Sequence, residues 1–286
     1  RFVIKMNPAI TKLSVMEGCF FRALVSQLFD AGQLLSFFFA LLNSFFQGFR
    51  STRILMQVIV KFLRKKITNE LAHTIANENK TIGDIRKIVF YTGHQGPIEI
   101  GCNKEFLDWL TDPVQNGAGA LTDFGCYGAN LATWFMNGET PITVSAVTQQ
   151  IKPDKYPKVD DEATILLTYK NAQVIIQAPW NWPYGRKEME LYGNKGYIFC
   201  KTGSKMSVKE EGKKEELSDD LPPLPPGRDD PFAYFANVIR GNIKIKPFDL
   251  SSSENNEIVV KILEAAKIAA RTGKTVNWAQ QYKKQL

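Results

Sequence analysis

Residues 71–286 are predicted to adopt an α+β fold, with an open, mixed and largely antiparallel sheet and helices on one face. Two observations lead to this expectation. Short β-rich segments follow one another through short turns between residues 142 and 209, and strands in such a series usually pair antiparallel. Helical patterns precede this run within 117–138 and follow it near the C-terminus. Residues 1–70 differ, and form an atypical helical and apolar segment.

The composition indicates a globular protein, because 44% of the residues are hydrophobic and 12% are aromatic. The net charge of +7 comes from one end of the chain. Residues 1–70 hold ten Lys or Arg against three Asp or Glu, whereas residues 71–286 hold 26 of each kind. Since the larger part carries no net charge, nothing in it favours a nucleic-acid partner.

Neither the cysteines nor the histidines are spaced like metal ligands. The four cysteines are Cys19, Cys102, Cys126 and Cys200, and the two histidines are His73 and His94. No Cys-x-x-Cys pair occurs, so no zinc or other metal site is expected. Free thiols are typical of a reducing compartment and favour a cytoplasmic location, with an exported parent protein left open.

The first seventy residues conflict with the rest in composition. They contain 11 of the 19 phenylalanines, and Ala31–Phe49 is 19 residues long without a charge. A membrane span needs about 20 mostly apolar residues, and polar side chains dilute this run. Three interpretations remain open: a buried helix pair, a weak membrane anchor at 31–49, or sequence that does not belong to this fold. A strand at 54–60 and a helix at 65–79 are expected next.

The remaining elements follow in order. Strands are expected at 85–91, 142–150, 162–169, 173–178, 189–192 and 197–200, with an edge strand at 205–209. Gly193-Asn194-Lys195-Gly196 predicts a hairpin turn. After the proline-rich connector Pro222–Gly227, one helix opens at Asp230-Pro231 and another at a capping box in Ser251–Glu254. The apolar stripes of both helices are expected to cover one face of the sheet.

The most informative stretch is Gly117–Gly138. A turn of small residues, Gly117-Ala118-Gly119-Ala120, precedes Asp123 and Tyr127. Residues four apart on a helix share one face, and an acid beside a phenol can bind or deprotonate a hydroxyl compound. The alternative is an aspartate stabilised by the helix dipole and a half-buried tyrosine. Gly-x-Gly-x-x-Gly, phosphate-loop, Gly-x-Ser-x-Gly and His-Glu-x-x-His motifs are all missing.

Longer runs carry a family resemblance. GDIR at 83–86, HQGP at 94–97, LDWLTDP at 107–113 and GAGALTDFGCYGANLATWFM at 117–136 resemble the glucose–fructose oxidoreductase/inositol dehydrogenase/rhizopine-catabolism (Gfo/Idh/MocA) family. So do KVDDEAT at 158–164, APWNWP at 178–183, RKEMELYGNKGYI at 186–198 and EAAKIAARTGK at 264–274. The resemblance covers about residues 71–278 and corresponds mainly to the C-terminal domain of the family. The spacing Asp-x-x-x-Tyr resembles its glucose–fructose oxidoreductase-like members.

The resemblance implies a Rossmann domain that binds NAD or NADP, followed by an α/β domain with an open sheet. Hydride would pass between a nicotinamide and a sugar, a polyol or a derivative, and one sheet face would form subunit contacts in a homo-oligomer. Asp123 and Tyr127 match the catalytic polar pair that positions the reacting hydroxyl and helps its proton leave. Gly117, Gly119 and Ala120 match the turn that lets the backbone approach the cofactor.

Further residues are candidates for substrate binding. Trp180 and Trp182 could stack on a sugar ring, although aromatics at a strand end are commonly part of a core or an interface. His94 could carry a proton in the cleft, or be a loop histidine whose hydrogen bonds are satisfied. Arg186 could contact a phosphate, or lie in a solvated charged turn.

The sequence also departs from the family. It has no counterpart of the Rossmann fingerprint or of the Glu-Lys-Pro motif, whose lysine binds substrate. The expected function is therefore an NAD(P)-dependent oxidoreductase that is incomplete in this chain. Two alternatives stay open: a non-catalytic remnant that serves as an oligomerisation or interaction module, and a nicotinamide-assisted glycoside hydrolase.

Overall fold

The structure, a computed structural model, describes residues 67–218 and 220–282. The predicted N-terminal segment, with its apolar run at 31–49 and its strand at 54–60, lies outside the described residues apart from 67–70. Within the described part of the chain, no helix combines the length and the apolar character that a membrane crossing requires.

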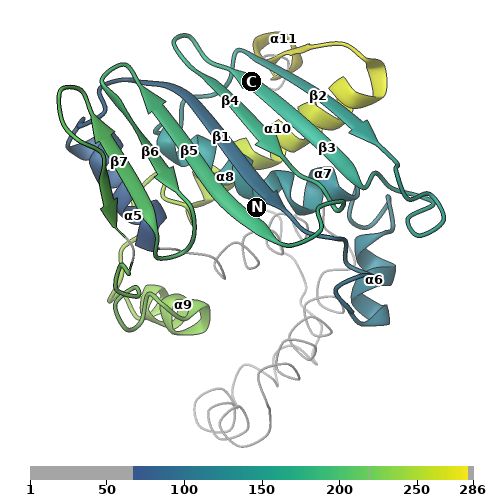
Figure 1. Cartoon of the computed structure of the whole chain (residues 1–286). Coiled ribbons are helices and arrows are strands. Elements are labelled where there is room, and N and C mark those ends of the chain that lie inside the picture. The colour runs from purple at the N-terminus through teal and green to yellow at the C-terminus, as the bar shows by residue number, and fades with distance from the viewer. Residues whose placement is uncertain (1–66, 219, 283–286) are drawn as a thin grey trace, which may run out of the picture. The chain divides into compact units, whose positions relative to one another are not determined.

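The described residues contain one sheet of nine strands in the order β8-β7-β6-β5-β1-β4-β3-β2-β9 (Figure 1). In chain order the strands are β1 (Ile85–Gly93), β2 (Thr143–Gln149), β3 (Glu162–Thr168), β4 (Gln173–Gln177), β5 (Arg186–Gly193), β6 (Gly196–Cys200), β7 (Met206–Glu210), β8 (Glu216–Ser218) and β9 (Val276–Asn277). The seven strands predicted after residue 80 are all present. Strands β8 and β9 are additions at the two edges.

The sheet is mixed, as predicted. β1 and β4 run parallel, with Ile88 opposite Val174 and Tyr91 opposite Gln177. Every other neighbouring pair of strands in the described residues is antiparallel. The predicted hairpin joins β5 to β6, and Tyr192 pairs with Tyr197 across it. The turn is tied to the start of β1, because the side-chain oxygen of Asn194 accepts a hydrogen bond from the N–H of Asp84 at 2.7 Å.

The helices are α5 (Ile67–His73), α6 (Lys104–Leu110), α7 (Ala120–Asp123), α8 (Gly125–Phe135), α9 (Pro231–Ile239), α10 (Ser253–Thr272) and α11 (Trp278–Tyr282), with a π-helical turn η1 (Thr74–Glu78). Together, α5 and η1 make up the helix predicted at 65–79. Figure 1 shows α7, α8 and α10 behind the sheet, and no described helix in front of it. The prediction of helices on one face is therefore confirmed.

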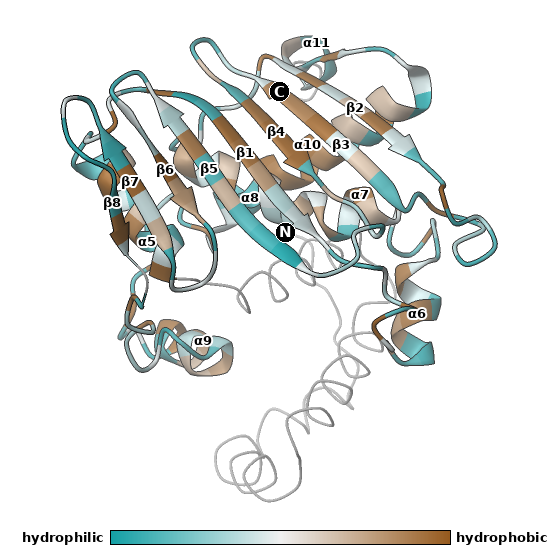
Figure 2. Ribbon diagram, in the orientation of Figure 1, coloured by the Kyte–Doolittle hydropathy of each residue, from teal (hydrophilic) through white to brown (hydrophobic). Residues whose placement is uncertain are grey.

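Alternation along the strands builds the core between the sheet and these helices. Phe90, Ile165 and Ile176 point to the helical side, and each is at most 1% exposed. Figure 2 shows hydrophobic residues concentrated along the central strands β1, β3 and β4. Helix α8 lies close to β4 because Gly128 has no side chain, and a Cβ there would be 2.5 Å from Cγ2 of Ile176.

Of the two C-terminal helices, only α10 behaves as predicted. The Ser252 side chain caps it, accepting a hydrogen bond from the N–H of Asn255, and it ends at Gly273 in the left-handed conformation. Helix α9 begins at the predicted cap, because Asp230 accepts from the N–H of Ala233. The apolar stripe of α9 does not cover the sheet, however. Its members are 44–69% exposed: Phe232, Phe235 and Ile239. The proline-rich connector places α9 beyond the end of the sheet (Figure 1).

Candidate active site

Two loops meet where the parallel strands β1 and β4 end. His94 follows the last residue of β1, and Trp180 lies three residues after the end of β4. The N–H of His94 donates to the carbonyl oxygen of Pro179 at 3.2 Å, which ties the two loops together. In open α/β sheets, ligands bind beyond the carboxyl ends of parallel strands. This edge of the sheet is the candidate site.

Helix α7 brings Asp123 to this edge. The indole Nε1–H of Trp180 donates a hydrogen bond to Oδ2 of Asp123 at 3.0 Å. Trp180 is fully buried and Asp123 is half-buried. The carboxylate is therefore held from the protein side by a neutral donor that water does not reach.

The segment from Ala120 to Phe135 is two helices rather than one. The helix is interrupted at Phe124, between α7 and α8. The N–H of Tyr127 donates a hydrogen bond to the carbonyl oxygen of Phe124 at 3.1 Å. Tyr127 lies in the first turn of α8 and is half-buried, with its ring 6.0 Å from the ring of Phe124. Asp123 and Tyr127 thus belong to two consecutive short helices, and the residue between these helices, Phe124, keeps a right-handed helical backbone (φ −98°, ψ −30°).

Asp160 caps the N-terminus of α7 from a distant part of the chain. Its carboxylate oxygens accept hydrogen bonds from the N–H of Gly119 at 3.0 Å and of Leu121 at 2.7 Å. Its carbonyl oxygen accepts from the N–H of Ala120 at 2.9 Å. These are the groups that a helix leaves unpaired at its start. Burial raises the pKa of Asp160, and the N–H groups of Leu121 and Gly119 oppose that shift.

The cap formed by Asp160 involves the same turn, Gly117–Ala120, that was predicted to approach a cofactor. Gly117 has a φ of 89°, in the left-handed region that favours glycine. A side chain on Gly119 would collide with the carbonyl oxygen of Asp160. The N–H groups of Gly119 and Ala120 are already bound to Asp160. Close packing within the domain is therefore a sufficient reason for the small residues at this turn.

His94 lies on the helical side of the edge. Its Nδ1 accepts a hydrogen bond from the N–H of Gly96 at 2.9 Å, so the proton of the neutral ring is on Nε2. The ring meets Phe124 edge-on, with centroids 4.7 Å apart. The structure thus places His94 next to the break between α7 and α8.

Trp182 and Arg186 are placed on the other face of the sheet. The Arg186 guanidinium pairs with Glu188 at 2.7 Å and lies 4.6 Å from the ring centre of Tyr91 and 5.2 Å from that of Trp182. Tyr91 alternates with Phe90, which is buried under the helices. The structure does not bring these two residues together with Asp123.

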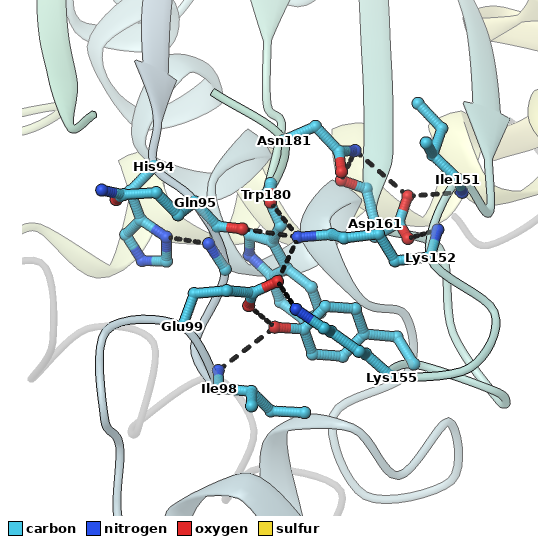
Figure 3. Close-up of polar contacts among 12 residues, drawn as sticks. His94, Gln95, Ile98, Glu99, Ile151, Lys152, Lys155, Asp161, Trp180 and Asn181 are labelled. Atoms are coloured by element: carbon cyan, nitrogen blue, oxygen red, sulfur yellow. Dashed lines mark hydrogen bonds and ion pairs between the residues drawn. The ribbon is translucent and has the colours of Figure 1, made fainter. Parts of the chain in front are cut away.

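Lys152 fixes the loops around Trp180. Its ammonium group donates to the carbonyl oxygens of Gln95 at 2.5 Å and Trp180 at 2.7 Å, and to Oε1 of Glu99 at 2.7 Å. Figure 3 shows Lys152 reaching between the loop that carries Gln95 and Glu99 and the backbone of Trp180. One cation therefore ties the end of β1 to the end of β4.

Glu99 is the anion of this network. Lys155 and the Tyr156 hydroxyl also donate to its carboxylate. Burial acts to raise the pKa of Glu99, but the hydrogen bonds from Lys152, Tyr156 and Lys155 outweigh it and lower the pKa to about 2. Burial and the hydrogen bond to Glu99 raise the pKa of Tyr156. Glu99 is thus ionised and Tyr156 protonated over the physiological range.

Asp161 holds the other side of the same loops. Its carboxylate accepts hydrogen bonds from the N–H groups of Ile151 at 2.8 Å and Lys152 at 2.6 Å, and from the Asn181 amide at 3.1 Å (Figure 3). Its carbonyl oxygen accepts from the N–H of Trp180 at 2.8 Å. The two adjacent acids therefore bind different parts of the fold. Asp160 caps the start of α7, and Asp161 holds the loop that carries Trp180.

Sequence reasoning missed five residues that hold the site: Glu99, Lys152, Tyr156, Asp160 and Asp161. It considered Trp180 only for stacking on a sugar ring, which the full burial of this side chain excludes. One signal was available, because Asp160 and Asp161 are two consecutive acceptors directly before an alternating strand, and buried backbone N–H groups need acceptors. The partner of each residue could not be read from the sequence.

A surface hollow of about 340 Å³ lies between the Gly117–Leu121 segment and α10, and its lining does not include Asp123, Tyr127 or His94. In the described residues, no group of three His, Cys, Asp or Glu side chains could hold a metal ion. Among the described residues, Cys102, Cys126 and Cys200 form no disulfide with one another.

Comparison with known proteins gives a family for the larger part of the sheet domain. Residues 74–199 match the GFO/IDH/MocA C-terminal domain. No curated protein sequence matches the chain.

Solved structures share the fold at low sequence identity. Aldose–aldose oxidoreductase from Caulobacter crescentus, complexed with glycerol, is 21% identical over 76% of this chain and 62% of its own length, with a TM-score of 0.57. The inositol dehydrogenase homolog from Azotobacter vinelandii, complexed with NAD⁺, is 16% identical over 73% of this chain and 62% of its own, with a TM-score of 0.57. Levoglucosan dehydrogenase, complexed with NADH and levoglucosan, is 18% identical over 77% and 64%, with a TM-score of 0.60.

The match to these structures is partial, since the chain spans only 62–64% of their lengths. The family match and the mixed nine-stranded sheet with helices on one face agree with one another. Residues 74–199 of this chain match the GFO/IDH/MocA C-terminal domain, which confirms the resemblance predicted from the sequence.

Proposed function

We propose that the described residues form the substrate-handling part of an NAD(P)-dependent oxidoreductase acting on a sugar, a polyol or a derivative. One observation carries this proposal. A half-buried carboxylate, Asp123, lies at the carboxyl ends of the two parallel strands with one oxygen bonded to the indole of Trp180. Tyr127 follows at the start of the next helix.

Asp123 and Tyr127 have the chemistry that a hydroxyl substrate needs. A carboxylate accepts a hydrogen bond from an alcohol and takes its proton when the carbon is oxidised, and a phenol donates to a neighbouring oxygen. Proton transfer by a positioned group accelerates a reaction by roughly 10²–10⁴. We assign proton acceptance to Asp123 and substrate orientation to Tyr127, with His94 beside them.

The start of α7 does not fit the pyrophosphate of a dinucleotide. Helix-start N–H groups are a common pyrophosphate site, but those of Gly119, Ala120 and Leu121 are bound to Asp160. A nicotinamide, which takes or gives the hydride when it is bound, would have to be held by other residues. What the described residues can do is bind a hydroxyl compound, orient it and exchange its proton.

Calorimetric titration of the full chain with glycerol, myo-inositol and D-glucose tests substrate handling. We expect saturable binding of at least one compound, and about tenfold weaker binding in the double variant Asp123→Asn, Tyr127→Phe, because two hydrogen bonds to the ligand are altered. A matched control is Asp108→Asn, Tyr184→Phe, which changes an exposed acid and a phenol that is 65% exposed. Unchanged affinity in the first double variant would refute the site assignment.

Titration with NAD and NADP separates the proposal from its main alternative. If the chain is an interaction module without catalysis, neither nucleotide nor polyol binds. If nucleotide binding is saturable and reduction of the nucleotide depends on the polyol, the oxidoreductase proposal holds for this chain. Release of a free sugar from a glycoside without net reduction of the nucleotide would instead favour glycoside hydrolysis.

We also propose a homo-oligomer formed through the front face of the sheet. The register places Leu166, Ile175 and Val89 in one row across that face. The row continues through Glu190, Phe199 and Ser207 to Leu217, so polar residues interrupt it. Leu217 is 67% exposed, as is Val147 in the next row. Exposed apolar residues gathered on a sheet face are a common protein–protein contact.

A further inference from the structure

We infer that Trp180 is a positioning residue for Asp123, an inference whose catalytic meaning rests on the proposed function. The indole N–H holds Oδ2 of the carboxylate and so sets the orientation in which Asp123 meets a substrate hydroxyl. Trp180 does not itself contact the substrate, because its side chain is fully buried.

The contact between Trp180 and Asp123 has the geometry of a well-formed hydrogen bond. Nε1 and Oδ2 are 3.0 Å apart, within the usual range for an N–H donor. An indole has one donor and no acceptor, and a buried indole is generally satisfied by one partner. Here that partner is a carboxylate 57 residues away in the chain. A neutral donor favours the ionised carboxylate without adding a charge to the site.

The backbone of Trp180 is held at both its N–H and its carbonyl oxygen. Its N–H donates to the carbonyl of Asp161 at 2.8 Å, and its carbonyl oxygen accepts from Lys152 at 2.7 Å. Lys152 is in turn paired with Glu99 at 2.7 Å. The Tyr156 ring packs 4.9 Å from the indole and is fully buried. The donor is therefore fixed before any substrate arrives, and this preorganisation is what a positioning residue requires.

Cys102 is a titratable group that is electrostatically coupled to Asp123. Burial, followed by the charge of Asp123, raises the pKa of the Cys102 thiol above its usual value. Asp161 and Lys152 are hydrogen-bonded to the backbone N–H and carbonyl oxygen of Trp180, not to its ring nitrogen. The Cys102 thiol keeps its proton between pH 7 and pH 3, so the Asp123→Asn variant decides which carboxyl group causes a titration step seen at the Trp180 indole.

Nuclear magnetic resonance of the ¹⁵N-labelled full chain tests the inference. The chain has five tryptophans, and Trp180→Phe identifies the Trp180 indole resonance by its disappearance. We expect this resonance to move through one carboxyl titration step between pH 7 and pH 3, and to lose that step in Asp123→Asn. The Trp278 indole, on α11, serves as the internal control and should keep its behaviour in both variants.

The second arm follows the carboxyl carbon of Asp123 in ¹³C-labelled protein. In Trp180→Phe, which keeps an aromatic ring but no donor, the titration midpoint of Asp123 should rise by about one pH unit, because the charged form has lost its hydrogen bond. An unmoved midpoint, or an indole step that persists in Asp123→Asn, would overturn the inference. If Trp180→Phe does not fold, sequence-specific resonance assignment of the wild type identifies the Trp180 indole, and the Asp123→Asn arm then decides.

These readouts need no substrate, so their failure is distinct from failure of the proposed function. If both resonance experiments give the expected result but no polyol binds, Trp180 still positions Asp123, and the proposed substrate class is wrong. With a polyol bound, Trp180→Phe should weaken its binding about threefold to tenfold, because the acid is less well oriented. Unchanged polyol affinity would refute the positioning role.

Discussion

The carbonyl oxygen of Asp160 occupies the space that a side chain on Gly119 would need. The same aspartate gives its carboxylate to the N–H of Gly119 and of Leu121. The start of α7 is thus pressed against, and capped by, a residue about forty positions later in the chain. Because α7 carries Asp123, this contact sets where the candidate acid stands.

Gly119→Ala should destabilise the domain. A new methyl group would meet backbone that cannot rotate away, and overpacking of this kind costs about 1–3 kcal/mol. Urea unfolding followed by far-ultraviolet circular dichroism measures the loss. Gly185→Ala is the matched control, since its Cβ would have no neighbour closer than 4.0 Å, and a change within about 0.5 kcal/mol is expected there. Equal stabilities for the two variants would contradict the prediction.

Gly128→Ala should also destabilise, although alanine is the better helix former. The gain in helix propensity is about 1 kcal/mol, whereas the new Cβ would lie 2.5 Å from Cγ2 of Ile176 and 2.9 Å from its Cγ1. A cost of about 1–3 kcal/mol from overpacking outweighs that gain.

A double-mutant cycle checks the cause of this loss. In an Ile176→Ala background the blocking atoms are gone, so adding Gly128→Ala should be neutral or stabilising. Chemical unfolding of the four proteins gives the coupling energy. If Gly128→Ala costs the same in both backgrounds, Ile176 is not the residue that excludes a side chain at position 128.

Glu99→Gln should remove an acid-sensitive part of the stability. The pKa of Glu99 is lowered from 4.5 to about 2, so the ionised group stabilises the folded state above pH 4.5. That contribution is lost as the pH falls from 4.5 towards 2. At neutral pH the variant should be less stable by on the order of 1–2 kcal/mol, after allowance for solvent screening.

The pH profile is the sharper measurement for Glu99. The difference in unfolding free energy between wild type and Glu99→Gln should shrink steadily below pH 4.5. Glu105→Gln, at an exposed position of α6, is the control for the loss of one carboxylate. A pH-independent difference for Glu99→Gln would mean that the ion pairs with Lys152 and Lys155 do not stabilise the fold.

The double variant Val147→Lys, Leu166→Lys should dissociate the proposed oligomer. Both side chains lie on the front face of the sheet, and two buried like charges oppose association. Sedimentation equilibrium should show at least about tenfold weaker association. Val114→Lys, at a loop position that is 74% exposed, is the control and should associate as the wild type does. A monomeric wild type would rule out the proposed oligomer at once.

Local sequence signals predicted most of the elements. The turn Gly193–Gly196 predicted the hairpin between β5 and β6, and Asp230 and Ser252 lie at the helix starts that their capping chemistry indicates. Each of these signals is complete within a few residues. They failed where the partner is distant, as for the exposed stripe of α9 and for the break at Phe124 between α7 and α8.

In the candidate site, too, local features could be read from the sequence and distant contacts could not. The spacing of Asp123 and Tyr127 could be read from the chain, and so could their match to a family pattern. The bond from Trp180 to Asp123 could not, and neither could the cap that Asp160 places on α7. Trp182, which is equally aromatic and two positions from Trp180, faces Arg186 on the other side of the sheet.

The sequence by itself therefore determined the strands, the hairpin, the helix caps and the choice of Asp123 and Tyr127 as candidates. Periodicity and turn chemistry act over a few residues and are visible in one dimension. Only the tertiary structure decided that β1 pairs in parallel with β4, which brings His94, Trp180 and Asp123 to one edge. Contacts between residues far apart depend on how the whole core packs, and no local pattern specifies them.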